Sequence, residues 1–497
     1  SKQFTAASIA LLEQQGKLSL DDDLRKYVPE IPAYKRPITL RHLLHHTSGL
    51  RDYLDLMTLA GLRTEDVSTD DDALRLLARQ KETNFPPGDE HLYCNSGFFL
   101  LSIVVKRVTG QPLREFARAN IFEPLGMRST RFHDDHTKIE PGRTTGYQPL
   151  EGGGFRIDMS NYEQTGDGSV FTNVEDLARW DANFYDPKVG GAPLLKTLQT
   201  RGTLNDGSSI DYALGLYLDD YRGLHRVSHG GSWAGYRAEL ARFPDQHFSV
   251  ACLCNLGTAS PSGLAMKVAD LYLTDSFTKP AADAVEATGG PTPTTGPPPV
   301  PDSAPPAGAV AGAATTPAPE ELSKEAGLYR NRATEEIVTV EARGSRLQVS
   351  RDGEMIEFEP AGGGRFRGAG GERELEIAFE AGKTNGARRL IFKARRGAPQ
   401  IFEATVPLEL SAQQLHAYAG SYWSEEMQVS YALSPEGGRL ALAVPNLPKL
   451  LLIPTARDIF AADALALRFD RDAASRVKGF RLGAGRIRNV GFVHAAR

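Results

Sequence analysis

The chain has 497 residues with 57 Lys and Arg, 62 Asp and Glu, and a formal net charge of −5. At roughly 100–200 residues per domain, this length corresponds to two to four domains. A hydrophobic content of 41% with 24% charged residues excludes a disordered chain or a fibre. The acidic balance offers no basic surface for nucleic acid, and the longest largely apolar run, 98–105, is too short to span a membrane.

The first part of the chain begins with helical patterns. Apolar residues recur at helical spacing over Phe4–Gln15, and a short helix is predicted over Thr39–His45, where Thr39 is a capping residue. Two further helices are predicted over Asp70–Gln80 and Ser96–Thr109.

Strand patterns follow near residue 240. The strands Arg237–Phe243 and His247–Asn255 flank a turn at 244–246, and a helix is predicted over Ser262–Leu273. Helices grouped around a terminal antiparallel hairpin predict an α/β (α+β) domain rather than a doubly wound parallel sheet. We therefore expect a first domain over residues 1–275.

The middle of the chain is rich in proline. Eleven of the 31 prolines fall between Pro280 and Pro319, among Ala, Gly, Thr and Val and without an aromatic residue. Such a stretch cannot bury enough apolar surface to offset the entropy of ordering it. We expect a linker over residues 276–319.

The last part of the chain reads as short strands separated by glycine turns, and it repeats weakly. Leu322-Ser323 before Gly327-x-Tyr329 matches Leu410-Ser411 before Gly420-x-Tyr422. The repeat predicts two small antiparallel, lipocalin-like β-barrels, over residues 320–408 and 409–497.

Six short motifs occur in order along the first domain. They are SKQFTA (1–6), GKLSLDD (16–22), LLHHTSGL (43–50), FPPG (85–88), YCNSG (93–97) and HGG (229–231). This series resembles the serine β-lactamase and penicillin-binding-protein superfamily. Its class C-like branch includes class C β-lactamases, D-alanyl-D-alanine carboxypeptidases, D-aminopeptidases and related esterases. The resemblance covers residues 1 to about 273.

The resemblance implies an acyl-enzyme mechanism and assigns the proton-transfer groups. Lys2 corresponds to the lysine of an S-x-x-K motif, and a lysine desolvated there has a lowered pKa and accepts the serine proton. Tyr93 would be the second proton-transfer group, and Asn95 would donate to the substrate carbonyl or to the lysine.

The strand motif His229-Gly230-Gly231 is implied to border the substrate. The oxyanion hole would comprise the N–H of the nucleophile and that of Ser232, just after this motif. The resemblance implies no metal and no organic cofactor.

The expected nucleophile is not in this sequence. In S-x-x-K the serine lies three residues before the lysine, which is two positions before Ser1. Ser1 occupies the third motif position, and we expect its side chain to point away from that of Lys2. We expect a truncated N-terminus that also lacks a first strand or two and an export signal, and a fragment that is inactive as a covalent catalyst. The intact protein would be periplasmic or secreted.

The His-Gly-Gly motif also bears on the substrate. Many β-lactamases carry Lys-Thr-Gly here, and Lys is a permanent cation for a substrate carboxylate, whereas His is largely neutral near pH 7. The glycines leave the strand open to a substrate along its edge. This favours D-aminopeptidase-like, peptidase or esterase chemistry, cleaving an amide or ester bond of a small molecule or peptide that contains a D-amino acid. The two barrels also match the layout of D-aminopeptidases, in which a barrel loop shapes the active site.

Three histidines and one cysteine need separate interpretation. Because no Asp, Glu or Cys completes a ligand pattern with His42, His45 and His46, we predict no metal site there. We expect His46 to fix the turn at 47–49 by hydrogen bonding. Cys94, between two site residues, is interpreted as a small packing residue.

The sequence leaves two functions open besides that of a hydrolase. One is a catalytically inactive binding or regulatory protein whose barrels hold a ligand or partner. The other is a cell-envelope module in which the linker spaces the barrels away from the first domain. The residue two positions before Ser1 discriminates between the enzyme and the binding protein, since only a serine there supports the enzyme.

Overall fold

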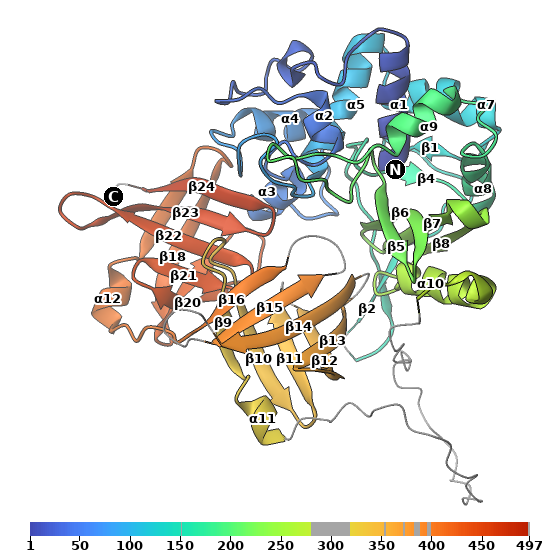
Figure 1. The fold of residues 1–497 in the computed structure, drawn as a ribbon. Coiled ribbons are helices and arrows are strands. Elements are labelled where there is room, and N and C mark those ends of the chain that lie inside the picture. The colour runs from blue at the N-terminus through green and yellow to red at the C-terminus, as the bar shows by residue number, and fades with distance from the viewer. Residues whose placement is uncertain are drawn as a thin grey trace, which may run out of the picture.

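The structure, a computed structural model, describes residues 1–150, 152–279, 319–351, 354–370, 373–381, 388–394 and 399–495 (Figure 1). Almost all of the predicted linker, 276–319, lies outside the described residues. Among the described residues, no helix has both the length and the apolar character that crossing a bilayer requires.

Helix α1 is the centre of the first domain. It packs against α5, α6 and α9 and is buried from Lys2 to Leu12. The predicted helices agree with the structure to within two residues. The helices of this domain are α1 (Lys2–Gln14), α2 (Leu40–Leu44), α3 (Tyr53–Leu59), α4 (Asp70–Ala78), α5 (Asn95–Thr109), α6 (Leu113–Ala117), α7 (Glu123–Leu125), α8 (Val174–Ala182), α9 (Gly191–Leu198) and α10 (Pro261–Tyr272).

An antiparallel sheet of four strands lies beside the helices. Its order is β5 (Tyr217–Tyr221), β6 (Leu224–Trp233), β7 (Tyr236–Phe243) and β8 (Phe248–Cys254), with α10 packed on β7 and β8. The predicted hairpin is β7 and β8. Two short pairs lie outside this sheet, β1 (Arg131–Phe132) with β4 (Val170–Phe171) and β2 (Tyr147–Pro149) with β3 (Phe155–Ile157).

Strand β6 is paired on both sides along only part of its length. Strand β5 pairs with residues Leu224 to Ser228 of β6, whereas β7 pairs with β6 as far as Trp233. Within the described residues, 229–233 therefore have a strand neighbour on one side only.

Two closed antiparallel barrels follow, as predicted. In each, every strand pairs with the next and the first closes onto the last. The first contains β9 (Gly327–Arg330), β10 (Ile337–Arg343), β11 (Arg346–Arg351), β12 (Glu354–Gly362), β13 (Arg365–Gly370), β14 (Arg373–Ala381), β15 (Arg388–Ala394) and β16 (Gln400–Thr405). The second contains β17 (Gly420–Ser424), β18 (Val429–Glu436), β19 (Arg439–Ala443), β20 (Leu450–Ala456), β21 (Ile459–Ala462), β22 (Leu465–Arg471), β23 (Val477–Ala484) and β24 (Ile487–His494).

The weak sequence repeat corresponds to a structural repeat. A short helix, α11 (Pro319–Ser323) or α12 (Ala412–His416), precedes the first strand of each barrel. The glycine that opens that strand has a φ of 150° in one barrel and 148° in the other. The buried Tyr329 and Tyr422 each donate a hydrogen bond of 2.8 Å to the carbonyl four residues earlier.

The second barrel is docked on the first domain beside α3 (Figure 1). Its apolar interior and the helices of the first domain form one continuous core. Tyr431 donates a hydrogen bond of 2.5 Å to the carbonyl of Leu59, and the buried Arg51 pairs with Glu426 at 2.6 Å. This contact argues against the alternative in which the linker holds both barrels away from the first domain.

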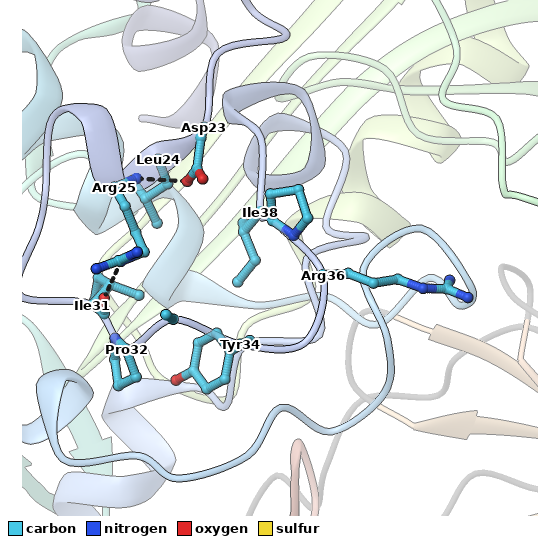
Figure 2. A pocket seen from close by; sticks show the side chains of 10 residues that line it. Asp23, Leu24, Arg25, Ile31, Pro32, Tyr34, Arg36 and Ile38 are labelled. Atoms are coloured by element: carbon cyan, nitrogen blue, oxygen red, sulfur yellow. Dashed lines mark hydrogen bonds between the residues drawn. The ribbon is translucent and has the colours of Figure 1, made fainter.

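A hollow of about 210 Å³ lies over the loop at residues 23–38 (Figure 2). Apolar groups such as Ile31 and Ile38 line it, and Arg25 at its edge donates a hydrogen bond of 3.0 Å to the carbonyl of Ile31. None of the residues of the six motifs that were assigned a chemical role lines this hollow.

Candidate active site

Lys2 lies in the first turn of α1 and is only 5% exposed. Its Nζ donates a hydrogen bond of 2.9 Å to Asn95 Oδ1 and one of 2.6 Å to the carbonyl oxygen of Asp167. Nζ also lies 4.8 Å from the centroid of the Tyr93 ring. The fold thus brings together three of the residues that the motif series singles out. Ser1 points elsewhere, as expected, and its Oγ accepts a hydrogen bond from the N–H of Val170.

Two glycines allow the chain to approach α1 and α5 closely. Gly215 has a φ of +73°, and a Cβ there would lie 2.7 Å from the carbonyl carbon of Lys2. Gly166 has a φ of +101°, and a Cβ there would lie 2.4 Å from the carbonyl oxygen of Phe98. Both glycines have a left-handed backbone and no space for a side chain. A larger residue at either position would push its segment away from α1 or α5 and so distort the site.

Burial lowers the pKa of Lys2 to about 8, against the opposing effects of Asp167 and Asp52. The charge of Arg486 lowers it further, and Cys94 raises it. Desolvation acts in this direction because the interior disfavours the ammonium form. Lys2 therefore has a much larger neutral fraction near pH 8 than an exposed lysine, which suits it to accept a proton.

Asn95 is oriented differently from the expectation that it donates to the lysine. An ammonium group has donors only, so Asn95 accepts from Lys2 through Oδ1. Donation by Asn95 to the lysine, one of the two predicted roles, is therefore wrong in direction, because Lys2 donates and Asn95 accepts. Donation to the substrate carbonyl stays a prediction. The backbone N–H of Asn95 donates to Asp52 Oδ2 at 2.6 Å, and this bond holds the start of α5.

His46 supports Tyr93 and does not fix the turn at 47–49. Its Nδ1 accepts a hydrogen bond of 3.1 Å from the N–H of Cys94, its carbonyl accepts one of 3.0 Å from Leu92, and its ring centroid lies 4.2 Å from that of Tyr93. His46 follows the end of α2 and has a left-handed backbone with a φ of 56°. The sequence pattern that predicted the end of this helix does not predict that conformation. Burial lowers the pKa of His46 well below its usual value, which keeps the ring a neutral acceptor.

Cys94 is buried, and its Sγ lies 3.2 Å from the carbonyl of Leu50. Burial raises the pKa of this thiol to about 12. Because the thiolate is the reactive form, Cys94 is an inert packing residue here.

The His-Gly-Gly motif lies on β6, facing the Tyr93 side of the site. His229 Nδ1 lies 2.6 Å from the carbonyl of Gly230, which can only accept, so Nδ1 carries a proton and Nε2 faces the hydroxyl of Tyr212 at 3.0 Å. The His229 and Tyr93 ring centroids are 6.2 Å apart. Gly231 and the exposed Ser232 belong to the part of β6 that, among the described strands, pairs with β7 only. A polypeptide could therefore lie along this edge.

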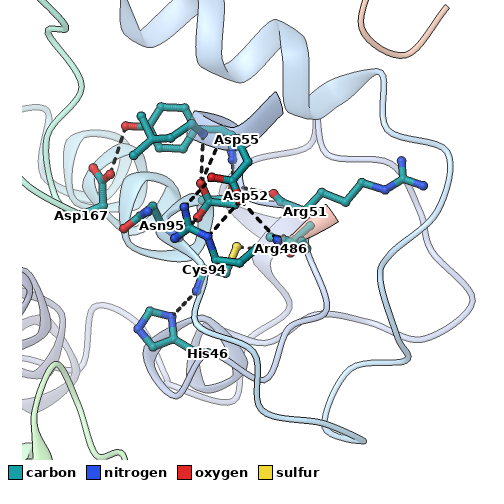
Figure 3. Close-up of polar contacts among 12 residues, drawn as sticks. His46, Arg51, Asp52, Asp55, Cys94, Asn95, Asp167 and Arg486 are labelled. Atoms are coloured by element: carbon teal, nitrogen blue, oxygen red, sulfur yellow. Dashed lines mark hydrogen bonds and ion pairs between the residues drawn. The ribbon is translucent and has the colours of Figure 1, made fainter. Parts of the chain in front are cut away.

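Two acidic residues of the site carried no signal in the sequence. Asp52 is fully buried behind Asn95, and Asp167 accepts a hydrogen bond of 3.1 Å from the Tyr53 hydroxyl (Figure 3). Burial raises the pKa of Asp167 to about 6, although Lys2 opposes this. Asp167 lies between two glycines, a pattern typical of a turn only, and its position beside α1 is set by contacts distant in sequence.

One group of side chains has metal-ligand character without belonging to this site. Asp135, His136 and Glu163 place one potential ligand atom each within 4.8 Å of one another. His136 Nδ1 is already hydrogen-bonded to Glu163 at 2.8 Å, and Asp135 accepts from Thr137. These contacts account for the arrangement without an ion.

Known proteins resemble this chain in both sequence and fold. The family model described as Beta-lactamase matches residues 1–275. A D-aminopeptidase of Brucella anthropi is 32% identical over 289 residues, which cover 57% of this chain and 54% of that relative. A D-aminopeptidase of Brucella melitensis is 27% identical over 517 residues, covering 99% of this chain and 87% of that relative. The octameric penicillin-binding protein homologue from Pyrococcus abyssi shares the fold, with a TM-score of 0.52 and 22% identity over 81% of this chain and 86% of that one.

Proposed function

We propose, from the premise that this chain belongs to the β-lactamase family, that it is a serine peptidase or amidase acting on substrates that contain D-amino acids. The observation that carries the proposal is the buried Lys2, hydrogen-bonded to Asn95 beside Tyr93. The alignment of 99% of the chain, barrels included, with a D-aminopeptidase supports the substrate class.

The proposed nucleophile is a serine two positions before Ser1. Its hydroxyl oxygen attacks the substrate carbonyl carbon while its proton passes to the neutral Nζ of Lys2. The oxyanion is bound by the N–H of the nucleophile and that of Ser232. When the tetrahedral intermediate collapses, the C–N bond breaks and the amine leaves with a proton delivered through Lys2 and Tyr93. Water then attacks the acyl ester, which releases the acid and restores the serine.

We expect kcat/KM to rise with pH through about 8 and to level off above it. The reason is that Lys2, whose pKa is lowered to about 8, must be neutral in the free enzyme to accept the serine proton. Initial rates on an uncharged amide between pH 5 and 10 check this. A profile flat from pH 6 to 9 would count against Lys2 as the base.

The substrate class is tested on a chain that includes the native residues preceding Ser1. We expect hydrolysis of D-alanine and D-phenylalanine p-nitroanilides, and at least about a hundredfold lower kcat/KM for the L-enantiomers, a difference of about 2.7 kcal/mol in transition-state stabilisation. D-Ala-D-Ala peptides, a cephalosporin and a short ester complete the panel. Equal rates for the two enantiomers would refute the D-specific assignment.

Covalent labelling separates the enzyme from the inactive binding protein. If the residue two positions before Ser1 is a serine, a fluorophosphonate probe should add one group per chain at that serine. A different residue there, or labelling that persists after replacement of both Lys2 and Tyr93, would favour the binding-protein alternative.

A further inference from the structure

The turn between β23 and β24 of the second barrel carries an arginine into the first domain. Arg486 Nη1 lies 3.1 Å from Asp52 Oδ2, and its Nη2 and Nε lie 2.6 and 3.0 Å from the two carboxylate oxygens of Asp55. Figure 3 shows Arg486 between these two carboxylates. The contact joins residues 431 positions apart in the chain.

Asp52 is the group through which Arg486 reaches the site. Its carboxylate is fully buried and accepts hydrogen bonds from the N–H groups of Leu54 and Asp55, at the start of α3, and of Asn95, at the start of α5. Cys94, which precedes α5, offers no side-chain cap, so Asp52 performs this task from another segment. Asn95 in turn accepts from Lys2.

A buried carboxylate in this position needs a cation. Burial raises the pKa of Asp52, and Arg486 opposes that rise. Asp52 also favours the charged form of Lys2, and Arg486 disfavours it. The two charges therefore cancel in part at Lys2, so that Asp52 can hold Asn95 without fixing Lys2 in its ammonium form.

We propose that Arg486 is a positioning residue of the hydrolase site: supplied by the second barrel, it balances the charge of Asp52, which holds Asn95 against Lys2. This inference rests on the proposed function, and it gives the second barrel a role in the hydrolase site. Under this proposal, the reactivity of Lys2 depends on whether the turn between β23 and β24 is packed against the first domain.

The turn is held by bonds that do not involve the Arg486 side chain. Asn84 Nδ2 donates to the carbonyl of Arg486 at 2.8 Å, and its Oδ1 accepts from the N–H of Arg488. Arg51 Nε donates to the carbonyl of Arg488 at 2.9 Å. Replacing the Arg486 side chain therefore leaves the turn several contacts that keep it in place.

The titration of Lys2 tests the proposal directly. The measurement is the pH midpoint of the Lys2 ¹³Cε signal by NMR, assigned by its absence in Lys2→Met. The charged and titratable groups around Lys2 are Asp167, Asp52, Arg486, Cys94, His46, Tyr93 and, in the chain as it stands, the amino group of Ser1.

In Arg486→Gln we expect the Lys2 midpoint to move to higher pH, because three N–H groups keep Asp52 ionised near pH 8 without its arginine. Arg486→Lys should leave the midpoint near that of the native protein. Asp52→Asn combined with Arg486→Gln should reverse the shift, since both charges are then absent. In the active enzyme, each unit of the shift lowers kcat/KM about tenfold below the midpoint.

Arg488→Gln is the matched control. Arg488 lies two residues after Arg486, at the start of β24, but pairs with Glu90 at 3.0 Å, away from Asp52, so the Lys2 midpoint should stay unchanged. An unshifted midpoint in Arg486→Gln, or a shift that persists in the double variant, would overturn the proposal. Because the midpoint is read without substrate, failure of the proposed hydrolytic function cannot be mistaken for failure of this assignment.

Discussion

Replacing Lys2 by Met in the intact enzyme is expected to lower kcat on a D-amino-acid amide by about a thousandfold or more. General-base catalysis contributes about 10²–10⁴-fold, and Met has no group that takes the serine proton. The measurement is steady-state kinetics together with the rate of acylation by a fluorophosphonate probe, and both should fall together.

The stability of this variant separates loss of chemistry from loss of fold. Asn95 and the carbonyl of Asp167 lose a donor, which costs about 1–3 kcal/mol, while removal of a buried amine offsets part of that cost. Lys17→Met is the control, because Lys17 is exposed three residues after α1 ends at Gln14 and should change neither rate nor stability. A Lys2→Met enzyme with at least a tenth of the native kcat would contradict the mechanism.

Glu426→Gln is expected to cost about 3–5 kcal/mol of stability at the interface between the first domain and the second barrel. Arg51 is 0% and Glu426 5% exposed, and breaking a buried pair leaves an uncompensated charge. Glu426 also accepts hydrogen bonds from the N–H groups of Lys81 and Gly491, and the amide of Gln cannot accept at both positions.

The measurement for this variant is guanidinium unfolding combined with hydrogen exchange of residues 50–60 and 484–492. Separate exchange readings are needed because a protein of several domains need not unfold in one step. Glu425→Gln is the adjacent control. Glu425 pairs with Lys81 while both are exposed, and such pairs contribute below about 1 kcal/mol. Equal losses of unfolding free energy in Glu426→Gln and Glu425→Gln would show that the buried pair contributes no more to stability than the exposed one.

The site was predictable where its residues belong to contiguous motifs. Lys2, Tyr93 and Asn95 each stand in a short run with a recognisable neighbour, and the structure brings these residues together. The direction of the bond between Lys2 and Asn95, and the role of His46, depend on side-chain orientation, which a motif does not contain. His46 has a left-handed backbone, and its Nδ1 accepts a hydrogen bond from the N–H of Cys94.

Asp52, Asp167 and Arg486 could not be predicted in this way. Each lies in a loop or turn without a motif, and each acts on Lys2 from a different part of the chain. Their effect is electrostatic, so it depends on distance and burial and not on spacing along the sequence.

The sequence alone predicted the helices α1, α2, α4, α5 and α10, the hairpin of β7 and β8, and the two barrels that follow the first domain. Helical periodicity, strand alternation, turn residues and the repeat at Tyr329 and Tyr422 are local properties, because each is set by sterics and burial within a few residues. The tertiary structure alone decided that the second barrel docks beside α3 and that its Arg486 reaches Asp52. The physical reason is that a buried carboxylate without a nearby cation is costly. The cation that pairs with it must be close in the folded protein, but it can come from any part of the chain.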